Sequence, residues 1–339
     1  KQKCPEYIYN SFQGFKAEEI ESNDLDITKT KIYDHLFNLC GRDEKVFKLW
    51  EGLGYYNRCK NLLFTARQIV KERKGKFPQT YEELILLKGV GPYTAAAIAS
   101  FAYNLPYAVV DGNVFRVFSR FYGIATPIDT PKGILLFNKI ANENLSQTQA
   151  GVYNQALMDF GATICKPLAP LCISCPLQKK CKAFTQQQVS LLPVKLKTIQ
   201  KKNRYFDFII FQYQKTYFIQ KRVLTDIWSN LYQFYLIENQ KRSKMNNAYL
   251  KKHIHSLLNF DTSSIEKVEV SSIFKQTLTH QQIEARFILV VVKNKPTFTS
   301  QGLWVKKEGF TKYPFPKIVN DFLKLAFHKS NGFFLFKKS

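Results

Sequence analysis

Residues 165–181 read Cys165-Lys-Pro-Leu-Ala-Pro-Leu-Cys172-Ile-Ser-Cys175-Pro-Leu-Gln-Lys-Lys-Cys181 and hold four of the seven cysteines of the chain. Thiols this dense in a chain otherwise poor in cysteine favour metal ligation over disulfide bonding, and over buried, unligated cysteines. Four thiolates can hold a tetrahedral zinc ion or a [4Fe–4S] cluster. Zinc sites usually contain two Cys-x2-Cys pairs, and only Cys172 and Cys175 form one here. The uneven spacing, Cys-x6-Cys-x2-Cys-x5-Cys, therefore favours a cluster held by a wrapping loop.

A second motif, Gly89-Val90-Gly91, lies between two stretches of helical pattern, residues 81–87 and 94–103. Glycine permits backbone conformations that expose consecutive N–H groups. The start of the following helix adds positive partial charge, so such a turn suits a phosphate. The pattern predicts a helix-hairpin-helix that contacts the DNA backbone without reading its sequence.

The run Leu49-Trp-Glu-Gly-Leu-Gly-Tyr55-Tyr-Asn-Arg58 interrupts a helical pattern with two glycines and presents two tyrosines beside an arginine. Tyrosines that follow a glycine turn are often core residues. They can also stack on bases or wedge between them. On the residues alone, both interpretations stay open for Tyr55, with the core role favoured.

Asp111 ends an apolar run and precedes a helical pattern that begins at Gly112. Aspartate is a good N-cap residue, and the residue type alone favours that role. A carboxylate fixed at a helix start also stays ionised. An ionised carboxylate is what stabilises an oxocarbenium-like sugar in glycoside hydrolysis, so the two roles are compatible in one residue.

Together these motifs resemble those of the endonuclease III and MutY class of DNA glycosylases, most specifically over residues 45–181. The resemblance implies that Tyr55 inserts into the DNA stack, that Asp111 stabilises the sugar cation, and that Asn113 orients it. In the implied active site, Tyr93 stands where an endonuclease III-like lyase keeps its Schiff-base lysine, which implies hydrolysis without lyase chemistry. The implied ligands of a [4Fe–4S] cluster are Cys165, Cys172, Cys175 and Cys181.

After a polar and then basic stretch at 184–203, the pattern changes from helical to strand-like. Strands are expected at 205–213, 216–221, 231–238 and 283–293, and helices near 248–258 and 317–326. This arrangement resembles the MutT-like domain of MutY, but the Gly-x5-Glu-x7-Arg-Glu box of the Nudix hydrolases is missing, so pyrophosphate hydrolysis is not expected. The segment Leu278-Thr279-His280 resembles the Phe-Ser-His loop with which MutY reads 8-oxoguanine. The implied DNA contacts are Tyr55, Gly89, Val90, Gly91, Thr279 and His280.

The 339-residue chain has a formal net charge of +24 at pH 7. This charge points to a polyanionic partner, nucleic acid before an anionic membrane surface. The sequence contains no run of 18 apolar residues, so no membrane-spanning helix is expected. The first residues lack the apolar core of a signal peptide. Because thiolate ligands need a reducing compartment, we expect a cytoplasmic protein. We also expect it to be associated with DNA and monomeric. Since the chain begins with Lys1, we expect residues upstream to be missing from it.

The expected architecture is a mainly α helical glycosylase core at 1–183, with helix-hairpin-helix and iron–sulfur loop, a linker at 184–203, and an α+β MutT/Nudix-like domain at 204–339. The expected function is base excision repair, by hydrolytic removal of adenine mispaired with 8-oxoguanine or guanine in duplex DNA. The alternatives are a catalytically impaired lesion-binding homologue, an endonuclease III-like glycosylase/lyase, and a zinc-stabilised DNA-binding module.

One part of the chain departs from the family pattern. MutY-like enzymes carry their general acid, a glutamate, in a Glu-x-x-Leu-Gln-Gln-Thr helix upstream of the glycine–tyrosine turn. The family spacing puts that glutamate near Asn10, and no Leu-Gln-Gln-Thr occurs in residues 1–45. Glu6, Glu18 and Glu19 lie nearby with other neighbours. We expect an N-terminal segment that is either diverged or scrambled by a change of reading frame, with DNA binding retained and base release slow or absent.

Overall fold

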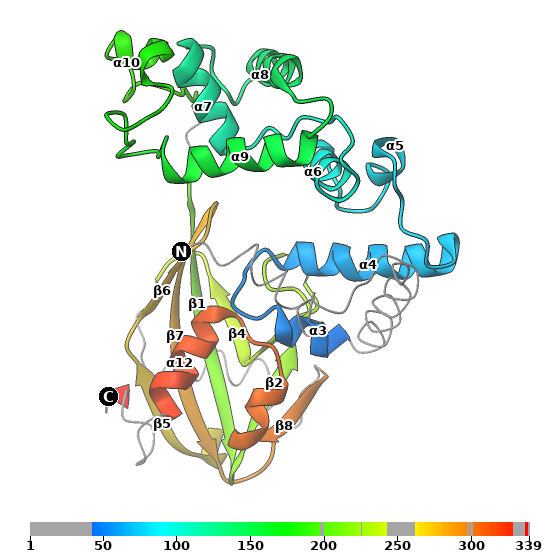
Figure 1. The fold of residues 1–339 in the computed structure, drawn as a ribbon. Coiled ribbons are helices and arrows are strands. Elements are labelled where there is room, and N and C mark those ends of the chain that lie inside the picture. The colour runs from blue at the N-terminus through cyan, green and yellow to red at the C-terminus, as the bar shows by residue number, and fades with distance from the viewer. Residues whose placement is uncertain are drawn as a thin grey trace.

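The computed structural model describes residues 43–196, 200–224, 226–242, 262–296, 298, 301–327 and 336–337. These residues form a lobe of helices and a lobe built on a β-sheet (Figure 1). The expectations for Asn10, Glu6, Glu18 and Glu19, and for a helix near 248–258, lie outside the described residues. Within those residues, every helix is too short or too polar to cross a bilayer.

The helical lobe is built around two small cores. One joins Ile69, Leu84 and Ala95, and the other joins Val114 and Phe137. Side-chain oxygens cap several helix starts, because the first N–H groups of a helix have no partner within it. The helices are α4 (Tyr56–Arg73), α5 (Tyr81–Leu84), α6 (Pro92–Tyr103), α7 (Gly112–Tyr122), α8 (Pro131–Asn144), α9 (Ala150–Thr163) and α10 (Lys182–Thr185).

The sheet is mixed, and the longest pairing in its described part is between the parallel strands β1 and β7, from Lys202 opposite Gln281 to Tyr213 opposite Val292. The main path runs β3-β2-β1-β7-β5-β9, with β4 on β1, β6 on β7 and β8 on β2. The strands are β1 (Lys202–Tyr213), β2 (Thr216–Lys221), β3 (Tyr232–Gln233), β4 (Tyr235–Asn239), β5 (Ile265–Ser271), β6 (Phe274–Thr277), β7 (Gln281–Val292), β8 (Gly302–Lys306) and β9 (Phe336–Lys337).

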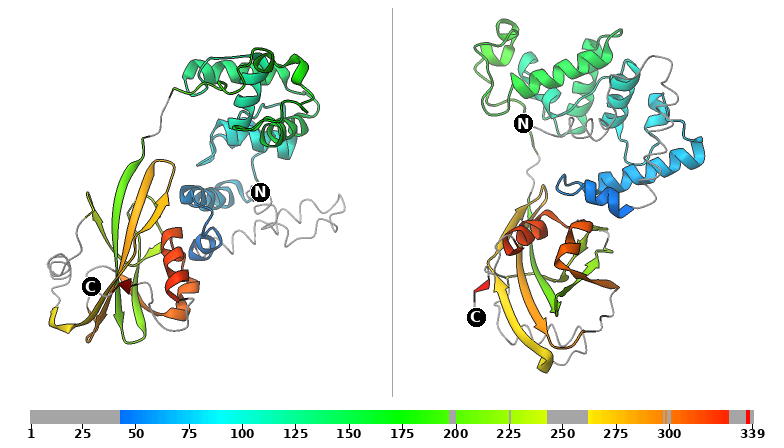
Figure 2. Two further views of the ribbon diagram at one scale, coloured as in Figure 1. Left: turned by 90° about the vertical axis from the view of Figure 1, so that its left-hand side faces the viewer. Right: turned by 60° about the horizontal axis from the view of Figure 1, so that its bottom comes forward.

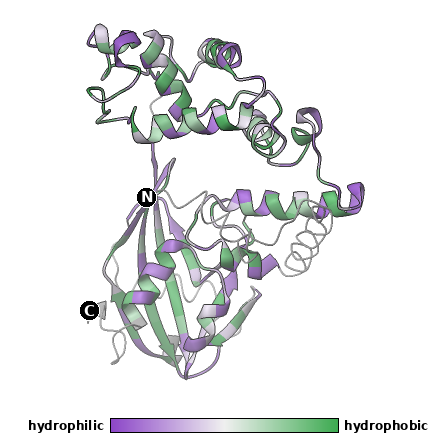
Figure 3. Ribbon diagram, in the orientation of Figure 1, coloured by the Kyte–Doolittle hydropathy of each residue, from purple (hydrophilic) through white to green (hydrophobic). Residues whose placement is uncertain are grey.

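Both faces of the central strands are buried, which the alternation of side chains along a strand explains. Phe206 and Phe208 face one core, whereas Ile209 and Phe211 face the other. Figure 3 shows these strands as predominantly apolar. On the first face lies α12 (Lys317–Phe327), whose Phe322 ring stacks on Phe287 at 3.9 Å between centroids.

The short helix α3 (Asp43–Leu49) and the first half of α4 pack on the sheet lobe rather than on the helical lobe (Figure 2). Phe47, Cys59 and Leu63 belong to the same buried cluster as the sheet and α12. Hydrogen bonds reinforce the contact: the Tyr232 hydroxyl donates to Glu44 at 2.6 Å, and the Phe315 N–H donates to Glu51 at 2.6 Å. Helix α4 therefore belongs to both lobes and fixes one against the other.

The observed fold belongs to the class expected from the sequence, but several of its helices and strands differ from those expected. Helix α4 begins at Tyr56, directly after the glycine–tyrosine turn. Helix α8 and strands β5, β6, β8 and β9 were not expected. The helix expected at 317–326 is present as α12.

Candidate functional site

Asp111 is the N-cap of α7, as its residue type predicts. Its Oδ1 accepts from the N–H groups of Asn113 and Val114, both at 2.8 Å. Its Oδ2 accepts from the Asn113 side-chain amide at 2.8 Å. Three donors thus fix a half-buried carboxylate at the positive end of a helix.

Asn113 is held in turn by Arg116, one helical turn further along α7. The Arg116 Nη2 donates to Asn113 Oδ1 at 2.8 Å and to the Gly161 carbonyl at 2.6 Å. Its Nε donates to the Cys165 carbonyl at 2.7 Å. Burial holds the pKa of the Arg116 guanidinium below its usual value. A continuous path of hydrogen bonds therefore joins the cysteine loop to Asp111.

Tyr93 lies in the first turn of α6 and is 45% exposed. Partial burial raises the pKa of its phenol, and the negative charge of Asp111 raises it further. Arg58 acts in the opposite direction. Tyr93, Asp111 and Arg58 therefore lie close enough to interact electrostatically, although they come from three separate segments of the chain.

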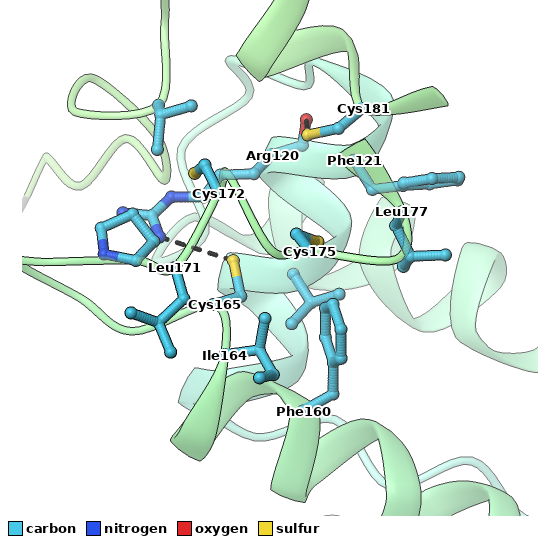
Figure 4. Close-up of a pocket in the computed structure, with 13 residues that line it drawn as sticks. Arg120, Phe121, Phe160, Ile164, Cys165, Leu171, Cys172, Cys175, Leu177 and Cys181 are labelled. Carbon is cyan, nitrogen blue, oxygen red and sulfur yellow. Dashed lines mark hydrogen bonds between the residues drawn. The ribbon is translucent and has the colours of Figure 1, made fainter. Parts of the chain in front are cut away.

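The cysteine loop, residues 165–181, follows α9 and is irregular except for one 3-10 turn at Gln178–Lys180. Cys165, Cys172, Cys175 and Cys181 all line one pocket, together with apolar side chains of α7 and α9 (Figure 4). Burial raises the pKa of the Cys172 thiol, and the neighbouring cysteines raise it further. Among the described residues, no three Cys, His, Asp or Glu side chains form a group placed to hold a metal ion.

Arg120 holds the start of this loop. It is 3% exposed, and its Nη1 donates to the Lys166 carbonyl at 2.7 Å while its Nη2 donates to the Pro167 carbonyl at 3.0 Å. The same Nη1 lies 3.5 Å from the Cys165 sulfur, the contact drawn in Figure 4. A cation with several carbonyl partners is a costly buried group that fixes the loop in one conformation.

Gly89 and Gly91 lie in the turn between α5 and α6. Gly89 has φ +83°, and an added Cβ would lie 2.5 Å from the side chain of Asn61 on α4. The Val90 N–H is used inside the turn, donating to the Leu87 carbonyl at 3.1 Å. Gly91 is the N-cap of α6, so the N–H groups of the first turn that follows have no partner within the helix.

Tyr55 and Thr279 are 224 residues apart in sequence and meet in space. The Tyr55 hydroxyl lies 3.2 Å from Thr279 Oγ1, and the Arg58 guanidinium lies over the Tyr55 ring at 5.0 Å. Tyr55 is 66% exposed and has φ +48°, an uncommon conformation for a residue with a side chain. Thr279 and His280 are exposed in the turn between β6 and β7. The core role that residue type favours for Tyr55 is therefore wrong; the neighbouring Tyr56 is the buried one.

Sequence reasoning did not identify Arg116 and Arg120. Both are buried, and they stand four residues apart on one face of α7. The sequence does contain a hint of their role. Both arginines fall on the face of α7 that also carries Val117, and a buried arginine is rare unless its charge is paired or hydrogen-bonded.

Comparison with known proteins gives matches in both lobes. The model of the HhH-GPD superfamily of base excision DNA repair proteins matches residues 32–140, and that of the NUDIX domain matches residues 208–325. Adenine DNA glycosylase of Buchnera aphidicola subsp. Acyrthosiphon pisum is 33% identical over 263 residues, which are 71% of this chain and 72% of that protein. Adenine DNA glycosylase of Mus musculus is 46% identical over 155 residues, 44% of this chain and 30% of that protein.

Among solved structures, a non-covalent endonuclease III–DNA complex is similar at 28% identity and a TM-score of 0.35, over 40% of this chain and 61% of the other. The match to the Buchnera protein is too long to fit within either lobe alone. The two domain matches confirm the expected fold class, a helix-hairpin-helix glycosylase core followed by a MutT/Nudix-like domain. The chain therefore belongs to the adenine DNA glycosylase family of base excision DNA repair enzymes.

Proposed function

We propose that this chain removes adenine paired with 8-oxoguanine in duplex DNA, by hydrolysing the N-glycosidic bond of the adenine. The main support for 8-oxoguanine as the base opposite adenine is the 3.2 Å contact between the hydroxyl groups of Tyr55 and Thr279. A tyrosine exposed enough to enter a base stack and a hydroxyl exposed enough to bond a purine edge stand side by side. Both would reach the same place on a duplex, the position opposite the extruded adenine.

Asp111 is the group we assign to the sugar. Departure of adenine leaves positive charge on the deoxyribose, and an adjacent anion held in advance stabilises that charge without reorganising. Three hydrogen bonds hold the carboxylate of Asp111, and Arg116 fixes the Asn113 amide that gives one of them. Asn113 is therefore assigned the role of orienting the carboxylate.

Tyr93 supports hydrolysis rather than lyase chemistry. A lyase forms a Schiff base through an amine, and a phenol cannot do this. A phenol is protonated at neutral pH, and the raised pKa of Tyr93 reinforces this, so it offers a hydrogen-bond donor beside Asp111 rather than a second anion.

The pocket of the cysteine loop fits a [4Fe–4S] cluster better than zinc. A zinc ion draws its thiolates to one point, whereas a cluster spreads them over the corners of a cube. The four cysteines line a common pocket and are unevenly spaced in the sequence, and Arg120 offsets the negative charge that thiolates bring. Cys165, Cys172, Cys175 and Cys181 would hold the cluster. When bound, it would supply a rigid cross-link of the loop.

The DNA contacts follow from the same assignment. Because the Val90 N–H is used inside the turn, the glycine N–H groups of the turn Gly89-Val90-Gly91 and the start of α6 would bind a backbone phosphate, which fixes register without reading sequence. In this proposal residues 1–183 carry the chemistry, 184–203 connect the lobes, and 204–339 read the base opposite adenine. The net charge of +24 suits such a contact with DNA.

A second candidate is a lesion-binding homologue with little base release. It is favoured by one observation, the lack of a Glu-x-x-Leu-Gln-Gln-Thr motif in residues 1–45. General acid catalysis contributes typically about 10²–10⁴-fold, so chemistry without a positioned acid would be slower by that order. DNA binding would remain, because the hairpin turn and the sheet lobe do not depend on the acid.

The test of the partner-base assignment is a double variant, Thr279→Ala with His280→Ala. Loss of one or two hydrogen bonds to the purine should reduce the preference for 8-oxoguanine over guanine by about 1–3 kcal/mol. The measurement is the ratio of dissociation constants for the two duplexes, at one salt concentration. A double variant that discriminates as well as the parent would contradict the assignment.

A further inference from the structure

Thr279 and His280 occupy a short turn that must be held still to read a base. We call residues 278–280, between β6 and β7, the reader turn. Within it the Leu278 N–H donates to the Gln281 carbonyl at 2.8 Å, and the His280 carbonyl accepts from the Lys202 N–H at 2.9 Å. These bonds close the turn and attach it to β1. They do not fix the side chain at the beginning of β7, which directly follows the turn.

Arg204 lies under that strand end. It is 8% exposed, and its Nη1 donates to the Gln281 side-chain oxygen at 3.2 Å. Gln281 is the first residue of β7 and directly follows the reader turn. The guanidinium thus reaches the turn through one side chain.

Four further contacts fix Arg204 itself. Its Nε and Nη2 form a bidentate pair with Glu238 at 2.6 and 2.5 Å, and Nη2 also bonds Asp226 at 2.8 Å. The guanidinium lies over the Phe206 ring at 4.8 Å. A planar donor with this many partners has one orientation available, so the remaining N–H points in a defined direction. Arg204 is buried, whereas the side chains of Asp226 and Glu238 remain 31% and 38% exposed. Ion pairs with solvent-exposed carboxylates contribute little net stability, and a geometric role accounts for the arrangement better.

We propose that Arg204 is a positioning residue for the recognition of the base opposite adenine. Through Gln281 it sets the orientation of the reader turn, so that Thr279 and His280 meet the purine edge at hydrogen-bonding distance. The inference rests on the proposed function, because it assumes that these two residues read the partner base. It adds that the selectivity is set from inside the sheet, by a side chain that never touches DNA.

The consequence is confined to selectivity. Hydrogen bonds weaken steeply with poor geometry, so a looser turn would lose discrimination between 8-oxoguanine and guanine. Base release would not change directly, because Asp111 lies in the other lobe. We expect affinity for the guanine duplex to stay within twofold while preference for 8-oxoguanine falls about two- to tenfold, the effect of one ordinary hydrogen bond.

The decisive variant is Gln281→Ala in the full chain, because it removes the acceptor and leaves the Arg204 ion pairs intact. Gln281→Glu keeps an acceptor and should retain the preference. The matched control is Gln282→Ala, the next residue of β7, whose side chain points to the opposite face of the strand. Arg204→Lys keeps the buried charge but lacks the planar fork, and should lose the preference as Gln281→Ala does.

The readout is the ratio of dissociation constants for adenine duplexes carrying 8-oxoguanine or guanine, with urea midpoints measured in parallel. Loss of preference in Gln281→Ala, with recovery in Gln281→Glu, supports the inference. Unchanged preference in Gln281→Ala, beside a loss in Thr279→Ala, overturns it and leaves the proposed function standing. Loss in Gln281→Glu or Gln282→Ala equal to that in Gln281→Ala also overturns it, because general damage to the strand would then explain the effect. A parent protein without any preference overturns both proposals.

Discussion

Replacing Asp111 by asparagine should separate its two roles, because an amide can cap a helix but cannot carry the negative charge. Asparagine and aspartate are comparable N-caps, so the bonds from the Asn113 and Val114 N–H groups survive on the amide oxygen. Two contributions are lost. The interaction of the charge with the helix dipole is worth about 0.3–1 kcal/mol, and the bond from the Asn113 amide about 1 kcal/mol. The cost in unfolding free energy should therefore be about 1–2 kcal/mol.

The cost to chemistry should be larger. Removing one preorganised electrostatic group from a transition state costs typically about 10²–10³-fold in rate, or about 3 kcal/mol. An anion beside a sugar cation acts in this way, so base release in Asp111→Asn should fall by at least that factor. The assay is adenine release under single-turnover conditions, with the protein in excess over an adenine:8-oxoguanine duplex, followed for hours because the parent is expected to be slow.

Thr130→Ala provides the matched control. Thr130 is the N-cap of α8 and accepts from the Gly133 N–H at 3.1 Å, in the same lobe but without contact to Asp111. Its removal should lower the unfolding free energy by about 1 kcal/mol and leave base release unchanged. If Asp111→Asn releases adenine at the parental rate, Asp111 is a cap and no more. If it lowers stability by far more than 2 kcal/mol, the rate cannot be attributed to the charge.

Three further outcomes are expected. Anaerobically purified protein should contain about four iron and four sulfide per chain, from the four cysteines of the loop; zinc in equal amount to protein, without iron, would exclude a cluster. Borohydride should not trap an adduct between protein and DNA, since Tyr93 has no amine; trapping at the level of a true lyase would refute its assignment. For Asp226, burial raises the pKa, but hydrogen bonds from Arg222 and Arg204 outweigh it and leave the pKa below its usual value. The stability it contributes is complete above about pH 4 and is lost as the pH falls through the lowered pKa, so Asp226→Asn should flatten the dependence of the urea midpoint on pH below 4; an unchanged slope would contradict this.

Elements that depend on local chemistry could be predicted from the sequence. Asp111 before Gly112 is an N-cap because its side chain reaches N–H groups two and three residues away. Gly89 marks a turn because φ +83° excludes most other residues. The cysteine loop lacks regular structure in its proline-containing part, as proline dictates. Strands β1 and β2 follow from β-branched and aromatic runs bounded by polar residues.

Contacts between distant segments could not be predicted from the sequence and became visible only in the folded chain. Nothing in the run around Tyr55 specifies that its hydroxyl meets Thr279, or that α4 divides its length between two cores. Arg116 and Arg204 read in sequence as ordinary surface cations, and both are buried by partners that lie tens of residues away. Local periodicity reports which face of an element is apolar, but not which face of another element covers it. That choice depends on the packing of the whole chain, because burial is favourable wherever complementary apolar surfaces and paired polar groups meet.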